Sequence, residues 1–151
     1  MSQPAFLTGQ DVGEAEGALT GLLNQVLAGT GTGITRAQYI VMRVLSARGP
    51  IASPAVHEYL AGQLQVGLDR LQVAELFRDL EAKGLVTGSA PDGPGPAQLT
   101  PDGTTLYAEL VGAVAPVTKR VFEGLDADDL AVAHRILAEV KERANRIRAE
   151  L

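Results

Sequence analysis

Apolar residues recur at steps of three and four along most of the chain, the spacing that places them on one face of an α-helix. Between residues 85 and 99 this spacing stops, and two short apolar pieces flank a loop rich in glycine and proline, which indicates a small β-hairpin. The pattern therefore predicts a mainly α-helical fold with one hairpin. The expected helices cover residues 11–28, 35–47, 53–62, a stretch from a turn near Val66-Gly67 to about Lys83, residues 101–122, and a last stretch that ends at Leu151.

Capping signals mark five of the helix starts. Three pairs of polar residues have the spacing of a capping box, in which a side chain at the helix start and another three residues later bond each other's backbone N–H groups. They are Asp11 with Glu14, Thr35 with Gln38, and Asp126 with Asp129. Ser53 and Thr100 each place a capping hydroxyl directly before a proline, the residue suited to the first helical turn.

The first and last predicted helices each carry a long apolar stripe. The stripe of the first is Val12, Ala15, Leu19, Leu22 and Val26, and the stripe of the last is Leu130, Ala133, Leu137, Val140, Ala144, Ile147 and Leu151. Such a stripe needs a partner surface along the whole helix, and a small domain offers few of them within one chain. We therefore predict that both helices form a dimer interface. The alternative is that both pack only within the monomer.

Three short motifs mark the junctions between the elements. They are Leu80-Glu81-Ala82-Lys83-Gly84-Leu85-Val86, Leu99-Thr100-Pro101-Asp102-Gly103 and Leu125-Asp126-Ala127-Asp128-Asp129-Leu130. In order and spacing they resemble the multiple-antibiotic-resistance regulator (MarR) family of winged-helix transcriptional regulators, over about residues 11–151. The resemblance implies a homodimer with interlocked terminal helices. It also implies that the third and fourth helices form a helix-turn-helix whose fourth helix enters the major groove of double-stranded DNA.

The same resemblance implies an arrangement of the chain in one structural unit. A flexible N-terminus covers residues 1–10, dimerisation helices cover 11–30 and 101–151, and a winged helix-turn-helix lobe covers 34–100. It further implies a pseudo-palindromic operator and a small aromatic or hydrophobic effector, held near Tyr39 and His57. A bound effector would favour a lobe spacing that no longer matches two successive major grooves, as in a repressor.

Candidate DNA contacts follow from the implied role of the fourth helix. Its exposed polar positions are Asp69, Arg70, Gln72, Glu75, Arg78 and Asp79. Arginine can pair with guanine, glutamine with adenine, and a carboxylate can accept from the cytosine amino group. An ordinary solvated helix face would carry the same pattern. In addition, Gln65-Val66-Gly67-Leu68 admits two alignments about two residues apart, and these give different contact positions.

Two further residues complete the predicted DNA-binding set. Ser53, at the start of the third helix, offers a hydroxyl and free backbone N–H groups to a phosphate, and the alternative is a plain N-cap. Arg36, on the polar face of the second helix, offers a cation.

The distribution of charge supports a second hypothesis. The chain has 13 basic and 18 acidic residues, a net charge of −5, and between residues 50 and 100 three bases face six acids. The hairpin loop Asp92-Gly93-Pro94-Gly95-Pro96 lacks the arginines that the family's wing usually carries. Since phosphate neutralisation dominates affinity for DNA, these features favour a dimeric winged-helix module for ligand or protein interaction that has lost DNA binding.

Other classes of function find little support in the sequence. The absence of cysteine excludes disulfides, thiolate metal sites and thiol-based redox sensing. No metal or cofactor site and no catalytic arrangement stands out around His57 and His134, the two histidines, so we do not expect an enzyme. Without a membrane-spanning stretch or a signal-peptide pattern, the expected compartment is the cytoplasm.

Overall fold

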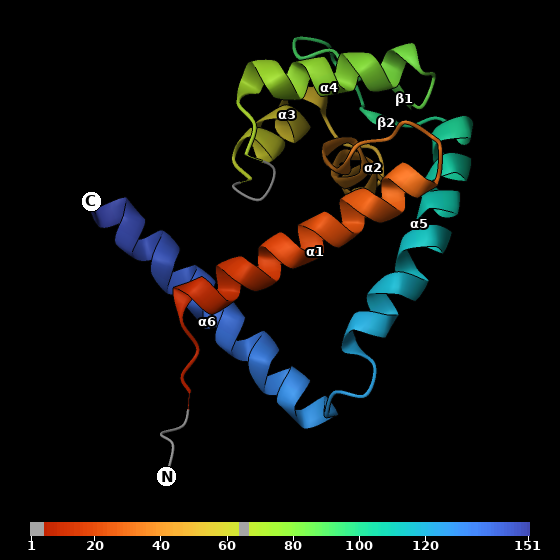
Figure 1. The fold of residues 1–151 in the computed structure, drawn as a ribbon. Coiled ribbons are helices and arrows are strands. Elements are labelled where there is room, and N and C mark those ends of the chain that lie inside the picture. Colours follow the sequence, from red (N-terminus) through yellow and green to blue (C-terminus); the bar gives the residue numbers. More distant parts are fainter. Residues whose placement is uncertain (1–4, 64–66) are drawn as a thin grey trace. The chain divides into compact units, whose positions relative to one another are not determined.

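The computed structural model of the chain describes residues 5–63 and 67–151. In these residues it has a mainly α-helical fold with one small hairpin, which confirms the predicted fold class (Figure 1). The predicted turn near Val66-Gly67 lies partly outside the described residues. The elements are α1 (Gly9–Gly29), α2 (Arg36–Arg48), α3 (Ser53–Ala61), α4 (Arg70–Ala82), β1 (Val86–Thr87), β2 (Gln98–Leu99), α5 (Pro101–Phe122) and α6 (Ala127–Glu150).

Local capping sets most of the helix starts. Thr35 and Gln38 form the predicted capping box of α2, and the Asp126 carboxylate accepts from the backbone N–H of Asp129 at the start of α6. For α1, the predicted capping box of Asp11 with Glu14 was wrong. Thr8 caps this helix and Asp11 is its third residue, because the Thr8–Asp11 pair has the same spacing and bonds reciprocally.

The hairpin is short and is extended by a segment from elsewhere in the chain. Strands β1 and β2 are antiparallel, with Val86 opposite Leu99. Ile51, just before α3, pairs with Ala97 through two backbone hydrogen bonds of 3.1 and 2.8 Å. The wing, defined here as β1, β2 and the loop 88–97 between them, is therefore attached to the helix-turn-helix on one side.

The chain divides into two compact units, Met1–Ala115 and Pro116–Leu151, and α5 runs through the boundary. The first unit contains one apolar core, to which α2 contributes the largest share, including the fully buried Val41 and Met42. Val56 and Leu60 of α3 join them. In Figure 1, α3 and α4 lie side by side, and they pack against each other as the two helices of a helix-turn-helix do. This packing fixes the direction in which α4 presents its outer face.

Helix α1 meets the core through residues outside its predicted stripe. Leu27 is buried in the core and Leu23 packs against it, whereas Leu19 is exposed and Leu22 and Val26 are half-buried. The stripe of α1 is therefore not used by the core of the first unit.

Helix α6, in the second unit, has no buried residue. Large apolar side chains nevertheless follow one side of it, at 41–53% exposure: Ile136, Leu137, Val140, Val132 and Ile147. We call these five residues, with the half-buried Leu130, the α6 apolar face. The dimer interface predicted from the stripes stays a prediction, and Leu151 lies just beyond the helix. No helix in the described part of the chain has the length and hydropathy needed to cross a membrane.

Candidate nucleic-acid interface

Helix α4 presents one side to the core and the opposite side to solvent. Val73, Phe77 and Leu80 are buried. At about 100° per residue, the positions opposite them are 71, 75 and 78, which follow each other at steps of four and three. These residues are Leu71, Glu75 and Arg78, and all three are exposed. We call them the outer stripe of α4, since this line of side chains lies farthest from the core.

The first turn of α4 is fixed by two of the predicted DNA contacts. The Asp69 carboxylate accepts from the backbone N–H of Gln72 at 2.8 Å, and the Gln72 amide oxygen accepts from the Asp69 N–H at 3.0 Å. Both side chains are exposed but hold the capping box of the helix. Arg70 is exposed between them and has no part in this box. Asp69 and Gln72 therefore stabilise the start of the helix, and Arg70 is the cation at its N-terminal end.

Ser53 does not occupy the place predicted for it. The N-cap of α3 is Ala52, so Ser53 is already the first helical residue, and its side chain is fully buried. Its hydroxyl donates to the carbonyl oxygen of Ala90 in the wing, at 2.6 Å. The interpretation as an N-cap is thus wrong, and the hydroxyl is used within the fold; a phosphate contact through the backbone N–H groups at the start of α3 stays a prediction.

We expect Ser53→Ala to lower the free energy of unfolding by about 0.5–1.5 kcal/mol, because it removes the hydrogen bond between a fully buried hydroxyl and the Ala90 carbonyl oxygen. The matched control is Ser46→Ala, at an exposed position of α2, which should change stability by less than about 0.5 kcal/mol. Thermal unfolding of the three proteins measures both effects. If Ser53→Ala instead bound DNA more weakly at unchanged stability, the result would support the predicted phosphate contact of Ser53.

Three hydrogen bonds hold the start of the wing loop against the helix-turn-helix. Besides the Ser53 bond, His57 Nε2 donates to the Ser89 carbonyl oxygen at 2.7 Å. The Ser89 N–H donates to a Glu81 carboxylate oxygen at 3.0 Å. We call this set the wing tether. It connects the loop to α3 and to α4 at once, so the loop lies on the lobe in a defined conformation.

The wing carries no basic residue. The one charged residue of the loop 88–97 is Asp92, which is exposed. Arg78 of α4 lines a small hollow against the loop, together with Ser89, Ala90 and Pro91. A basic group of α4 therefore borders the wing loop, and a minor-groove contact of the arginine type has no donor within the wing itself.

Tyr39 and His57, the predicted effector contacts, are both buried and belong to separate aromatic pairs. The Tyr39 ring lies 5.8 Å from that of Tyr107, centroid to centroid, and the His57 ring lies 4.6 Å from that of Phe77. Burial raises the pKa of the Tyr39 hydroxyl, Tyr107 raises it further, and Arg43 opposes the rise. Tyr39 is therefore a neutral phenol near pH 7. His57 has a structural role in the wing tether, and its predicted effector contact stays a prediction.

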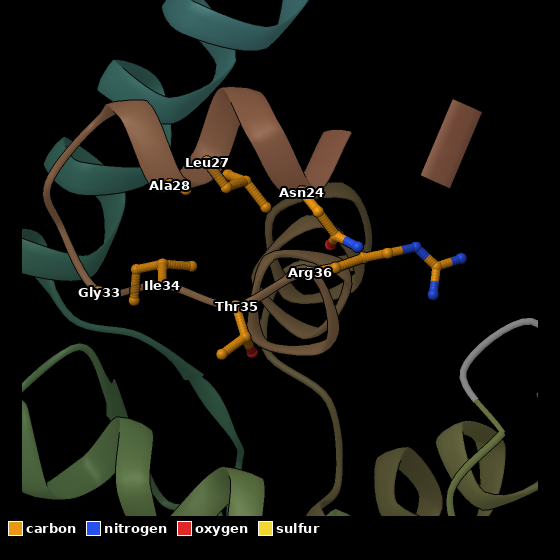
Figure 2. Close-up of a pocket in the computed structure, with 7 residues that line it drawn as sticks. All are labelled: Asn24, Leu27, Ala28, Gly33, Ile34, Thr35 and Arg36. Carbon is orange, nitrogen blue, oxygen red and sulfur yellow. The ribbon is translucent and has the colours of Figure 1, made fainter. Parts of the chain in front are cut away.

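Arg36 lies at a pocket between α1 and α2. Its guanidinium pairs with the Glu16 carboxylate of α1 at 3.7 Å. The pocket has a volume of about 330 Å³ and combines apolar walls with an amide, a hydroxyl and a guanidinium. Figure 2 shows Asn24 and Arg36 at one end and Gly33 and Ile34 at the other. Leu27, Ala28 and Thr35 complete the lining. Arg36 is therefore part of the pocket lining, and its predicted DNA contact stays a prediction.

Sequence reasoning missed Leu71, Glu81 and a contact between Arg48 of α2 and Tyr59 of α3. The guanidinium of Arg48 lies 4.1 Å from the centre of the Tyr59 ring, which ties the end of α2 to α3. Leu71 could have been found by helical arithmetic, because its position is opposite the core positions of α4. Glu81 carried no local signal, since its partner Ser89 lies across the hairpin junction. In the described residues, no three acidic or histidine side chains gather as a metal site would require.

Comparison with known proteins supports the fold. No protein-family model and no curated protein matches the sequence. Among solved structures, the transcriptional regulator PA3341 has a TM-score of 0.74 at 24% identity, over 91% of this chain and 98% of that one. A MarR-family transcriptional regulator from Rhodococcus sp. RHA1 has a TM-score of 0.68 at 22% identity, over 90% and 97%.

A third solved structure comes from a study of regulated DNA binding. BpsR of Bordetella bronchiseptica, whose DNA binding is regulated by 6-hydroxynicotinic acid, has a TM-score of 0.67 at 20% identity, over 92% of this chain and 98% of that one. The chain therefore has the winged-helix fold of MarR-family proteins, as the junction motifs implied.

Proposed function

We propose that this chain is a homodimeric, DNA-binding transcriptional regulator of the cytoplasm, and that it acts as a repressor. The observation that carries the proposal is the outer stripe of α4, which points away from the core with an apolar, an acidic and a basic side chain in line. A helix of a helix-turn-helix reads base edges in the major groove through such a face. The likeness in fold to structures described as transcriptional regulators supports this assignment.

The dimer supplies the symmetry that a pseudo-palindromic operator requires. Two apolar surfaces that are not fully buried are available for it, the α6 apolar face and the stripe of α1 that the core does not use. A large apolar surface rarely stays exposed in a soluble protein unless it binds a partner. We assign both to the interface between two copies.

The pocket between α1 and α2 is our candidate effector site. Its volume falls within the range of small-molecule sites, and its mixed lining suits an aromatic or hydrophobic molecule with one polar or acidic group. The regulation of BpsR by 6-hydroxynicotinic acid supports this chemistry by analogy. A molecule bound there would act on DNA affinity by favouring one arrangement of the dimer.

Selection from random double-stranded DNA, followed by mobility shifts at several salt concentrations, tests the proposal. We expect one enriched, pseudo-palindromic sequence. The second candidate function, an interaction module without DNA binding, is favoured by the cation-free wing and by the three bases that face six acids between residues 50 and 100. If no DNA sequence is enriched and the protein shifts no DNA at low salt, the proposed function is refuted and the second candidate remains.

A low number of phosphate contacts is a specific expectation of the proposal. If Arg70 and Lys83 of each protomer both met phosphates while Arg78 reads bases, a dimer would neutralise four, and log K would fall with log salt at a slope of about −3.6. Arg70→Ala should reduce the steepness by about 2 units, one for each protomer. Arg135→Ala, on the side of α6 opposite its apolar face, is the charge-matched control and should leave the slope unchanged. An equal change for both variants would remove Arg70 from the interface.

A further inference from the structure

Leu71 is the most exposed large apolar side chain within any helix of the described residues, at 77% exposure. It lies in the first turn of α4, next to Arg70, and takes no part in the capping box that Asp69 and Gln72 form. The buried core of the lobe uses Val73 and Phe77 of this helix and does not need Leu71. The stability of the fold therefore gives no reason for a leucine at this position.

The surroundings of Leu71 argue against a protein-docking surface. Its neighbours on the outer stripe are Glu75 and Arg78, and it is the one large apolar side chain of α4 among the exposed ones. Protein partners bind contiguous apolar patches, whereas here one leucine is enclosed by charges of both signs. The edges of the bases in the major groove match this arrangement, because the thymine methyl is an isolated apolar group among polar ones.

We infer that Leu71 is a specificity-determining residue that contacts a thymine 5-methyl group in each half-site of the operator. The other two side chains of the stripe have matching partners, because Glu75 can accept from a cytosine amino group and Arg78 can donate to guanine O6 and N7. The order of side chains along α4 then sets the order of bases that the helix reads. This inference rests on the proposed function, since it assumes that α4 enters the major groove.

Replacing thymine by deoxyuridine tests the contact, because it removes one methyl group and leaves base pairing intact. Each thymine of the selected operator is replaced in turn, symmetrically in both half-sites, and dissociation constants are measured for the wild type and for Leu71→Ala. For the wild type we expect one thymine position at which the replacement weakens binding about fourfold per half-site, the effect of one buried carbon group. Leu71→Ala should bind the thymine and deoxyuridine operators equally well.

Two controls separate recognition from folding. Leu71→Met keeps an apolar side chain and should keep the preference for thymine. Leu71→Ala removes an exposed side chain and should unfold at the same temperature as the wild type, since alanine is at least as good a helix former.

Three outcomes would overturn the inference, and they differ from one another. Selective operator binding in which Leu71→Ala and the wild type respond alike to every deoxyuridine refutes the methyl contact and leaves the proposed function intact. Unchanged operator affinity of Leu71→Ala, with loss of self-association, assigns Leu71 to an interface between copies. The absence of sequence-selective binding by the wild type refutes the proposed function itself.

Discussion

Leu137→Glu should convert the proposed dimer into a monomer at micromolar concentration. Leu137 lies in the middle of the α6 apolar face and is 45% exposed within one chain. In a dimer that buries this face, each copy would place an unpaired carboxylate in an apolar interface. Such a charge costs about 3 kcal/mol or more, which weakens association at least about 100-fold. Sedimentation velocity of the two proteins at equal concentrations measures the change.

The adjacent residue provides the control. Ala138 is exposed and, at about 100° per residue, lies on the side of α6 away from the apolar face. Ala138→Glu adds the same charge to the same helix and should sediment as the wild type does. If Leu137→Glu also sediments as a dimer, the α6 apolar face is not the interface. A wild type that is already monomeric would refute the dimer altogether.

Gly103→Ala should lower the free energy of unfolding by about 3 kcal/mol or more. Gly103 is the third residue of α5 and is buried, and a Cβ at this position would overlap the carbonyl oxygen of Leu85. The same carbonyl accepts the Thr100 N–H at 3.0 Å, so the added methyl group would separate α5 from the residue that precedes β1. Overpacking of this kind typically costs 1–3 kcal/mol, and here it also breaks a buried hydrogen bond. Thermal and urea unfolding measure the loss.

Gly112→Ala in the same helix should have the opposite sign. Nothing lies within 4 Å of a Cβ built at Gly112. Alanine in a helix interior is more favourable than glycine by about 1 kcal/mol, because it restricts the unfolded chain. The pair therefore compares one chemical change in two environments. Equal stability of Gly103→Ala and the wild type would show that Gly103 does not approach Leu85 as closely as the structure indicates.

Features that depend on neighbours in sequence could be predicted well. The capping box at Thr35, the Asp126 cap of α6 and the start of α5 after Thr100 each involve a hydrogen bond between residues three positions apart. The start of α1 was predicted wrongly for the same local reason. Both the Thr8–Asp11 and Asp11–Glu14 pairs have capping-box spacing, and spacing alone does not choose between them.

Features that depend on distant partners could not be predicted. The partner of Ser53 is 37 residues away and the partner of His57 is 32 residues away, and both are backbone carbonyls, which leave no mark in a sequence. Leu71 was missed for a different reason. Only the polar positions of this helix were considered as DNA contacts, although the angular position of Leu71 relative to Val73 and Phe77 already placed it outside the core.

The wing tether also affects the entropic cost of binding a partner. Ser89 and Ala90 are held by bonds to α3 and α4 in the free protein, before a partner binds. Association then does not order this loop, so the entropic cost of immobilising it, about 0.5–1.5 kcal/mol for each flexible side chain, is already included in folding. Binding by such a preorganised loop is rigid-body docking. Its heat-capacity change then reflects the surface that is desolvated, without a contribution from chain ordering in the wing.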